Sequence, residues 1–229
     1  MKYAVVIPAA GQGKRMQAGR NKQFLILEKK PLIIHTVSIF ENDPLCERII
    51  IVANDNEVNA MKKLLKEWKI NKVEAVVQGG KERQDSVFEG LKQLDASNLV
   101  FIHDGARPFV TQEQIHRLAG KTTAEGAAVL GVRMKDTVKK VKDGLVLETI
   151  ERSSVWSVQT PQAFQFHIIY DAYKKAQIDG YAGTDDTSLV ERMGIPIHIV
   201  EGSYDNIKLT TPEDMVVARA ILNKRKEGQ

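Results

Sequence analysis

The sequence predicts an α/β protein: a three-layer sandwich with a mostly parallel, Rossmann-like sheet and a protruding β-hairpin arm. Short apolar runs with little alternation recur along the chain, separated by amphipathic stretches, and this is typical of parallel strands covered on both faces. A repeated strand–helix–strand order implies right-handed crossovers and layers of helices on either side of the sheet. We expect one domain spanning residues 1–229, with the arm at about 133–159.

Five apolar runs are the expected strands of this sheet. They span residues 3–7, 48–53, 72–77, 99–103 and 127–132. Because polar and apolar residues alternate little in these runs, the strands are expected to be covered on both faces.

Helices are expected between the strands. The amphipathic segments are 31–40, 57–68 and 84–94, and two further helices open at Thr111 and Thr211. Thr111 and Gln114 form a capping-box pattern, in which each side chain pairs with the other residue's backbone. Two short stretches, 160–162 and 184–186, are interpreted as polar turns that can open a helix.

The hairpin arm is indicated by Asp143-Gly144 between two alternating runs, 137–142 and 145–150. Asp-Gly between alternating runs is a strong hairpin signal. Its apolar positions Val138, Val141 and Leu147 need cover, and a second subunit would supply it. The arm therefore predicts a homodimer.

Composition excludes several classes of protein. The 33 basic and 29 acidic side chains leave a surplus of only four, and no dense basic stripe with a nucleic-acid-binding motif is visible. No run is long enough to cross a membrane. The single cysteine, Cys46, has no metal-ligand spacing and suits a reducing compartment. We therefore expect a cytoplasmic protein that binds neither nucleic acid nor membrane.

The first apolar run is followed by a glycine-rich loop that carries basic side chains. Gly11 and Gly13 precede Arg15, and Lys22 follows. Backbone N–H groups in such a turn can bind an anion, and the cations can neutralise a polyphosphate. Met16 replaces the third glycine of a dinucleotide motif, which argues against a nicotinamide oxidoreductase. The loop alone fits a phosphate site and a plain strand–helix turn equally well.

Other loops end strands at the same predicted edge of the sheet. Asp104 follows the run 99–103, where ligands of open α/β sheets bind, and its carboxylate suits Mg²⁺ beside a polyphosphate. Its alternative roles are a turn cap or a partner of Arg107. His103 is interpreted as a structural histidine. The pair Asp205 and Lys208 suits a joint metal and phosphate site in a buried cleft, but a surface pair would mean little.

Eight motifs occur in one order along the chain: P-A-A-G-x-G-x-R-M, N-K-Q-F, G-G-K-E-R-x-D-S-V, H-D-G-A-R-P, D-T-V, T-P-Q-x-F, T-D-D and D-N-I-K. This set resembles the cytidylyltransferase family, and within it the 2-C-methyl-D-erythritol 4-phosphate cytidylyltransferases, from about Tyr3 to about Leu222. The resemblance implies a fold of the nucleotidyltransferase type. It also implies that CTP and methylerythritol phosphate react, with Mg²⁺, to give 4-diphosphocytidyl-2-C-methyl-D-erythritol and pyrophosphate, a step of non-mevalonate isoprenoid precursor synthesis.

The resemblance further implies a role for each matching residue. Arg15 and Lys22 would be catalytic, stabilising charge at the α-phosphorus while the substrate phosphate attacks it directly. The nucleotide would be bound by Ala9, Ala10, Gly11, Gly13, Gly80, Ser86 and Gly105. The metal would be held by Asp104, with Asp205 as a second ligand. The second substrate would be bound by Arg107, Thr137, Arg152, Thr160 and Lys208, of which Thr137 and Arg152 would reach the site from the neighbouring subunit.

Two departures from the family pattern stand in this chain. Asn21 replaces the usual Pro, which predicts a more mobile turn at Lys22. Gly105 replaces an Ala, for which we expect little effect. The alternative function is a ribitol 5-phosphate cytidylyltransferase, which tends to read L-A-G-G and D-x-V-R-P in place of the motifs here. A non-catalytic nucleotide-binding protein would not need Arg15, Lys22, Asp104 and Lys208 together.

Overall fold

The computed structural model describes residues 1–11, 16, 21–94 and 99–227. Its main sheet has the strand order β11-β7-β10-β6-β1-β4-β5. Only β10 runs antiparallel to its neighbours, and the other pairings of this sheet are parallel. The strands are β1 (Tyr3–Pro8), β4 (Cys46–Ala53), β5 (Val73–Gln78), β6 (Leu99–Ile102), β7 (Ala127–Arg133), β10 (Trp156–Gln165) and β11 (His198–Glu201).

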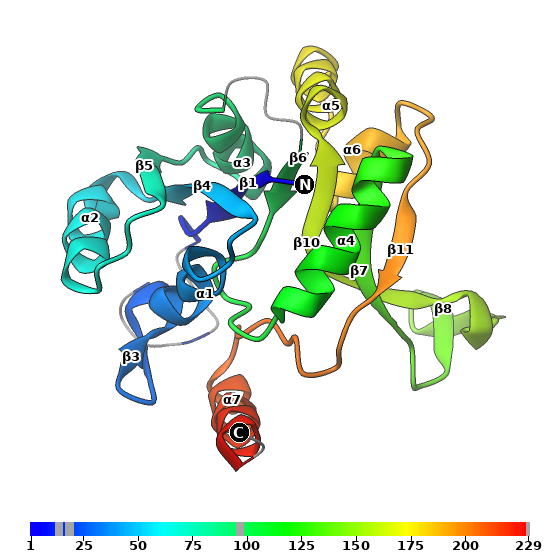
Figure 1. Ribbon diagram of the computed structural model, residues 1–229. Coiled ribbons are helices and arrows are strands. Elements are labelled where there is room, and N and C mark those ends of the chain that lie inside the picture. The colour runs from blue at the N-terminus through cyan, green and yellow to red at the C-terminus, as the bar shows by residue number, and fades with distance from the viewer. Residues whose placement is uncertain (12–15, 17–20, 95–98, 228–229) are drawn as a thin grey trace.

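Helices cover both faces of this sheet, which confirms the predicted fold class (Figure 1). One layer contains α1 (Leu32–Glu41), α2 (Val58–Glu67) and α4 (Gln112–Glu125). The other contains α3 (Arg83–Leu91), α5 (Phe166–Ile178) and α6 (Asp186–Glu191). The five strands expected from the apolar runs are all present.

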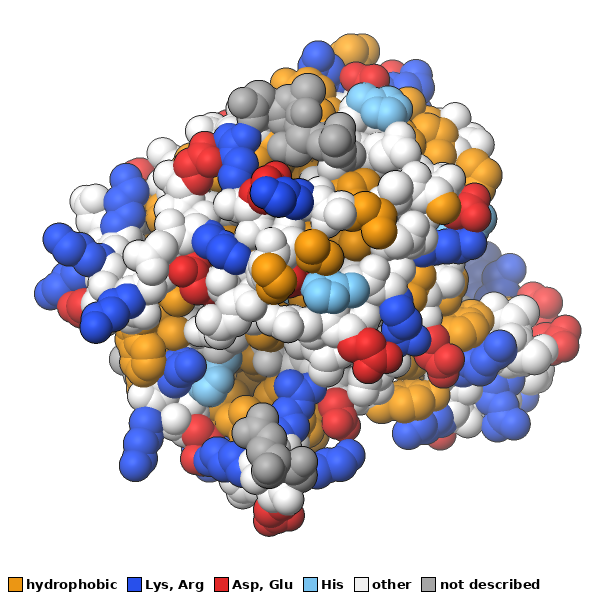
Figure 2. Space-filling view, in the orientation of Figure 1, with side chains coloured by type: hydrophobic (Ala, Val, Ile, Leu, Met, Phe, Trp, Pro, Cys, Tyr) orange, Lys and Arg blue, Asp and Glu red, His pale blue; other side chains and the backbone are white. Residues whose placement is uncertain are grey.

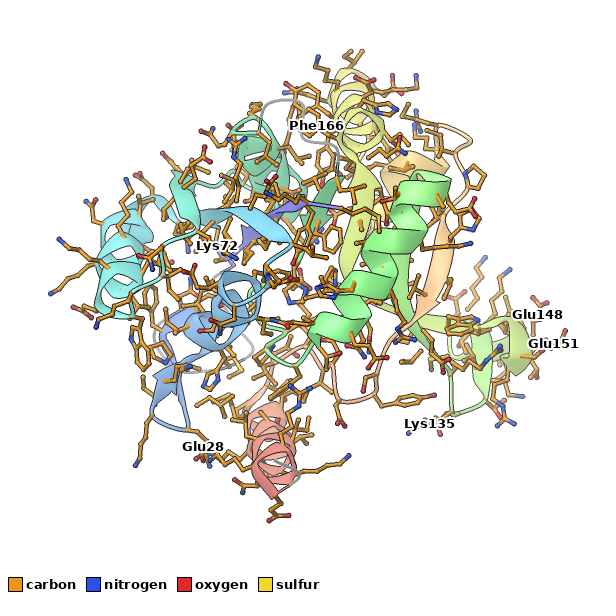
Figure 3. All side chains as sticks on the ribbon, viewed as in Figure 1. Glu28, Lys72, Lys135, Glu148, Glu151 and Phe166 are labelled. Carbon is orange, nitrogen blue, oxygen red and sulfur yellow. The ribbon has the colours of Figure 1, made fainter. Side chains whose placement is uncertain are left out.

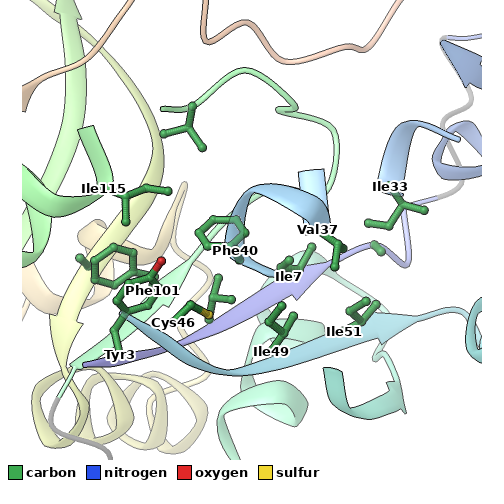
Figure 4. Close-up of a cluster of buried hydrophobic side chains, with 14 of the residues drawn as sticks. Tyr3, Ile7, Ile33, Val37, Phe40, Cys46, Ile49, Ile51, Phe101 and Ile115 are labelled. Atoms are coloured by element: carbon green, nitrogen blue, oxygen red, sulfur yellow. The ribbon is translucent and has the colours of Figure 1, made fainter. Parts of the chain in front are cut away.

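Alternation along the central strands explains the two layers. Val5 and Ile7 of β1 pack with α1, α2 and α4, whereas Ala4 and Val6 pack with α3, α5 and α6. Figure 4 shows the first of these clusters, where the rings of Tyr3 and Phe101 stack with centroids 4.3 Å apart. Each large apolar side chain buried there contributes roughly 1.5–3 kcal/mol. Cys46 lies in the same cluster, as a small buried residue.

Residues 160–162 and 184–186 were both expected to be polar turns, and the structure confirms only the second as the entry to a helix. Residues 160–162 are not a turn, because they lie inside β10, between β6 and β7, where a register shift separates Val158 from Gln162. Their polar side chains are tolerated at the centre of the sheet because partners satisfy them: the Gln162 amide donates to Asp185, and the Thr160 hydroxyl accepts from the Asp104 N–H. Asp185 is a helix entry, since its side chain caps α6.

The predicted hairpin is present as β8 (Val138–Lys142) and β9 (Leu145–Ile150), a separate two-stranded sheet that projects from the body (Figure 1). Asp143 and Gly144 both have positive φ, as the tight turn requires. Leu145 is 70% exposed, and Val141, Val146 and Leu147 are exposed as well. Figure 3 labels Glu148 of β9 and Glu151, which follows that strand, on the right-hand side of the arm, and Figure 2 shows basic and acidic side chains mixed over it.

The last helix, α7 (Pro212–Glu227), lies apart from both layers. It packs through Ala218 and Ile221 against Leu27 and Phe109, with the short strands β2 (Ile26–Leu27) and β3 (Lys30–Pro31) beside it. Lys226 pairs with Glu28 at 3.3 Å, beside the helix in Figure 3. Among the described residues, no helix combines the length and apolar character needed to cross a membrane.

Candidate active site

The carboxyl ends of β1, β4, β5 and β6 open on one edge of the sheet, and a cavity of about 490 Å³ lies there. Its lining comes from the predicted loops: Ala10 and Gly11 after β1, Gly80 and Ser86 after β5, and Asp104 and Gly105 after β6. Lys22 and Lys208 complete it. A second cavity of about 540 Å³ adjoins it and contains Arg107 and Thr160. Arg83, Asp104 and Lys208 line both cavities.

Asp104 lies at this junction, immediately beyond β6. Its backbone N–H donates to Thr160 Oγ1 at 3.0 Å, which fixes the residue against β10. One carboxylate oxygen is 2.7 Å from Lys208 Nζ and the other is 3.3 Å from Arg83 Nε. Burial alone would raise the pKa of Asp104, but Arg83, Lys208 and Arg107 lower it well below its usual range. The carboxylate is therefore anionic at neutral pH, with its charge matched by the neighbouring cations.

Lys22 opens a short 3-10 helix, η2 (Lys22–Phe24), and is buried at the cavity wall. Its ammonium donates to Leu209 O at 3.0 Å. Asn21 caps this turn: its side-chain oxygen accepts from Gln23 N, and its amide donates to Ala9 O and to Glu57. The expected mobility of this turn stays a prediction, and the Asn21 side chain makes contacts here that a Pro ring cannot make.

Gly80 is required by close packing at the entry to α3. A Cβ at this position would lie 2.3 Å from Asp85 Cβ, closer than real side chains come. Asp85 cannot move away freely, because it forms a capping box with Glu82. The glycine therefore keeps the cavity wall thin where a ligand would lie against it.

Gly105 has a local explanation that the sequence did not give. A Cβ here would lie 3.0–3.1 Å from the Gln23 amide and from Ile33 Cδ1. An Ala methyl group would require the ends of these side chains to shift by a few tenths of an ångström, and the expectation that the glycine has little effect stays a prediction. Thr36 Oγ1 donates to Gly105 O at 2.9 Å and fixes the loop further.

The second cavity has a hydrogen-bonded wall. His103 is fully buried, with Nδ1 3.2 Å from Thr160 Oγ1 and Nε2 2.9 Å from Arg107 O. Burial lowers the pKa of His103 to about 4, so the ring is neutral and structural, in line with its interpretation. Arg107 Nη1 donates to Asn206 O, which ties this wall to the chain just before Lys208.

The structure does not bring every expected site residue to these cavities. Ala9 is buried in the core beside the cavity, and its N–H donates to Val52 O. Asp205 lines neither described cavity and faces Lys224 at 3.7 Å. Thr137 and Arg152 are exposed on or beside the arm, where Arg152 donates to Lys135 O. Gly13 and Arg15 lie outside the described residues.

Arg83 is a site residue that sequence reasoning missed. Its guanidinium binds both oxygens of Asp186, at 2.9 and 2.6 Å, as well as Asp104. Burial would lower the pKa of Arg83, but the Asp186 and Asp104 carboxylates raise it above its ordinary value. The only sequence signal was its place in G-G-K-E-R-x-D-S-V, a motif from which only Gly80 and Ser86 were assigned roles.

Comparison with known proteins decides the family. The family model described as 2-C-methyl-D-erythritol 4-phosphate cytidylyltransferase matches residues 3–224. The chain belongs to this family. Curated cytidylyltransferases of that name from Halalkalibacterium halodurans and Geobacillus kaustophilus are each 52% identical over 225 residues, covering 98% of this chain and 99% of theirs. The family resemblance predicted from the motifs is confirmed.

Solved structures of 2-C-methyl-D-erythritol 4-phosphate cytidylyltransferases share the fold. The 4-diphosphocytidyl-2C-methyl-D-erythritol synthase from Anaerococcus prevotii superimposes with a TM-score of 0.86 at 31% identity, covering 97% of this chain and 96% of its own. The Thermus thermophilus cytidylyltransferase gives 0.79 at 29% identity, covering 96% and 98%. These names do not favour the ribitol 5-phosphate alternative.

Proposed function

We propose that this protein joins CTP and 2-C-methyl-D-erythritol 4-phosphate, releasing pyrophosphate and 4-diphosphocytidyl-2-C-methyl-D-erythritol. The observation that carries the proposal is the junction of two cavities at Arg83, Asp104 and Lys208. Two polyanions that repel each other must meet for this reaction, and cations at a shared wall reduce that repulsion. No protein nucleophile is needed, because the substrate phosphate itself attacks the α-phosphorus.

The cytosine, the ribose and the triphosphate of CTP would lie in the first cavity, beside β1. Ala10, Gly80 and Ser86 leave a narrow space suited to a cytosine ring, and Gly105 would contact the ribose. Gly11 and Gly13 would bind the triphosphate, while Lys22 and Arg15 would stabilise charge at the α-phosphorus. A fixed donor of this kind is worth about 3 kcal/mol in the transition state.

Magnesium dependence is part of this proposal. Asp104 suits Mg²⁺ because it is an anionic, hard oxygen donor at the wall of the proposed triphosphate cavity. Among the described residues no three His, Cys, Asp or Glu side chains gather as a metal cage. That donor set fits Mg²⁺, which in such sites is held by one or two carboxylates and by substrate phosphates. Bound Mg²⁺ would neutralise charge on the triphosphate. The position of Asp205 gives no support to its role as a second ligand.

The second substrate would occupy the cavity that contains Arg107, Thr160 and Lys208. We propose that the arm crosses to a second subunit, which would cover its exposed apolar side chains and bring Thr137 and Arg152 to the partner's site. The reaction also suits a cytoplasmic location, where CTP is made.

Pyrophosphate release tests the reaction. The protein is incubated with CTP, Mg²⁺ and either methylerythritol phosphate or ribitol 5-phosphate, with EDTA in a parallel series. We expect release with methylerythritol phosphate only, and none in EDTA. Faster turnover of ribitol 5-phosphate would contradict the substrate, and full activity in EDTA would contradict the metal.

Mixed dimers test the shared site. Arg152→Ala and Lys22→Ala subunits should regain activity when mixed, because one site of each mixed dimer then has an intact body and an intact arm. Arg152→Ala mixed with Thr137→Ala is the matched control, since no site is intact in that dimer. Equal activity in the two mixtures would show that each subunit works with its own arm.

A further inference from the structure

Arg83 has an unusual position for a residue without an assigned role. It is the first residue of α3, and its side chain lies at the wall that the two cavities share. Three of its nitrogens are engaged: Nη1 and Nη2 donate to Asp186, and Nε donates to Asp104 Oδ1 at 3.3 Å. A guanidinium bound in a fork by one carboxylate has a fixed orientation.

Asp186 is itself fixed. Its carboxylate is fully buried at the start of α6, and it accepts a hydrogen bond from the Tyr173 hydroxyl of α5. Leaving such a buried carboxylate without a cation would be costly, so Arg83 cannot swing away from it. The two terminal nitrogens of Arg83 are therefore held by Asp186 of α6, and this orientation directs Nε towards Asp104.

The two oxygens of Asp104 have partners of different kinds. Oδ1 accepts from the tethered Arg83, whereas Oδ2 faces Lys208 Nζ at 2.7 Å and Arg107 Nε at 3.8 Å. Lys208 is 38% exposed and carries a compact charge on a flexible stem, so it can turn towards a bound phosphate. Once Lys208 turns away, Arg83 is the fixed partner that remains on Asp104.

We propose that Arg83 is a positioning residue that holds the Asp104 carboxylate in place and thereby leaves Lys208 and Arg107 available to the phosphate of the second substrate. Asp186 and Tyr173 form the buried support of Arg83. The inference rests on the proposed function, because it assigns Lys208 and Arg107 to that phosphate. It predicts a specific defect: without Arg83, Asp104 competes with the substrate phosphate for the two cations.

Gln84 provides a matched control on the same two parts of the fold. Its side chain donates to Tyr181 O and accepts from Gly183 N, both at 2.9 Å, and so also links α3 to the chain that precedes α6. Gln84 lines neither cavity. If the only role of Arg83 is to join α3 to the chain around α6, then Gln84→Ala and the Arg83 variants should show the same change in KM.

Two Arg83 variants keep the test independent of folding. Arg83→Lys retains the charge beside Asp186 but cannot form the fork and the third bond together. Arg83→Met combined with Asp186→Leu removes both partners, which avoids an unpaired buried charge. For each variant, KM for both substrates, kcat, CTP affinity by calorimetry and the thermal midpoint are measured beside Gln84→Ala.

We expect KM for methylerythritol phosphate to rise about tenfold in the double variant, as for losing one hydrogen bond to a charged group, and by less in Arg83→Lys. The CTP affinity should change less than KM for the second substrate, and Gln84→Ala should keep wild-type values of both. Double-variant KM values equal to those of Gln84→Ala would overturn the inference and leave the proposed function intact. Failure of the wild-type protein to release pyrophosphate would instead reject the proposed function, and the inference with it.

Discussion

Asp104→Asn should destabilise the protein even when no ligand is present. Asp104 is 7% exposed, and its carboxylate lies within 4 Å of nitrogens from Arg83, Arg107 and Lys208. Asparagine keeps the shape but removes the negative charge, so three cations converge on a neutral group. Removing one partner of a fully buried ion pair costs about 3–5 kcal/mol.

That range must be reduced for this site. Arg83 and Lys208 are 34% and 38% exposed in their side chains, so water screens part of their repulsion. Asp186 also retains its pairing with Arg83. We therefore expect a loss of about 2 kcal/mol in the free energy of unfolding, between the buried and the surface limits. For a chain of this size the midpoint of thermal unfolding should fall by about 4–8 °C.

Urea unfolding at pH 7 in EDTA, without nucleotide, measures this loss. Asp205→Asn is the matched control, because Asp205 faces only the exposed Lys224 among the ion pairs of the described chain, and its loss should stay within about 0.5 kcal/mol. Equal stability of Asp104→Asn and the wild-type protein would refute the reasoning, because it would mean that the three cations repel each other too weakly to need the carboxylate.

Three further substitutions test other parts of the molecule. Gly80→Ala should lower kcat/KM for CTP about tenfold, since overpacking against Asp85 costs 1–3 kcal/mol; an unchanged value in steady-state assays would show that the wall can yield. Asn21→Ala should lower kcat more than it raises KM for CTP, because the turn that holds Lys22 loses its capping contacts; equal kcat would dismiss that support. Asp43→Asn should reduce stability at pH 7, and the difference should shrink once the pH falls below the ordinary Asp range: burial raises the pKa of Asp43, but hydrogen bonds from Tyr3 and His116 lower it on balance, so its contribution is present at neutral pH and is fully lost only below the lowered pKa. A difference in urea titrations that stays constant as the pH is lowered from 7 into the acid range would contradict that linkage.

The parts of the fold that could be predicted are those with local signals. Apolar runs marked β1, β4, β5, β6 and β7, because strands covered on both faces are rich in apolar residues. β5, at the edge of the sheet, is the exception to the expected burial, since Glu74 and Gln78 are exposed there. Thr111 marked the start of α4 through its own capping box. The arm was visible because Asp143-Gly144 fixes a tight turn whatever surrounds it.

β10 escaped prediction because its central residues are polar. Gln159, Thr160 and Gln162 are buried in the middle of the sheet, where Asn206, His103 and Asp185 satisfy their side chains. Those partners are distant in the sequence, so a local pattern cannot show that the strand is buried. The short edge strand β11 escaped because only four residues pair there.

In the candidate site, too, residues with a local sequence signal could be predicted and a residue defined by distant partners could not. Lys22, Asp104 and Lys208 follow recognisable motifs, and the structure brings all three to one cavity. Arg83 was missed because its main partner, Asp186, is 103 residues further along the chain. A sequence shows that an arginine stands at a helix start, but the carboxylate that orients it becomes visible only when the layers are assembled.

The backbone of Leu209 links the C-terminal helix to two loops that line the first cavity. Its N–H donates to Ala106 O, two residues beyond Asp104, and its carbonyl accepts from the Lys22 ammonium. α7 begins three residues later and packs beneath this segment. Deleting that helix would leave every residue that lines the two cavities in the chain, yet it would release the backbone on which two of the cavity-lining loops rest.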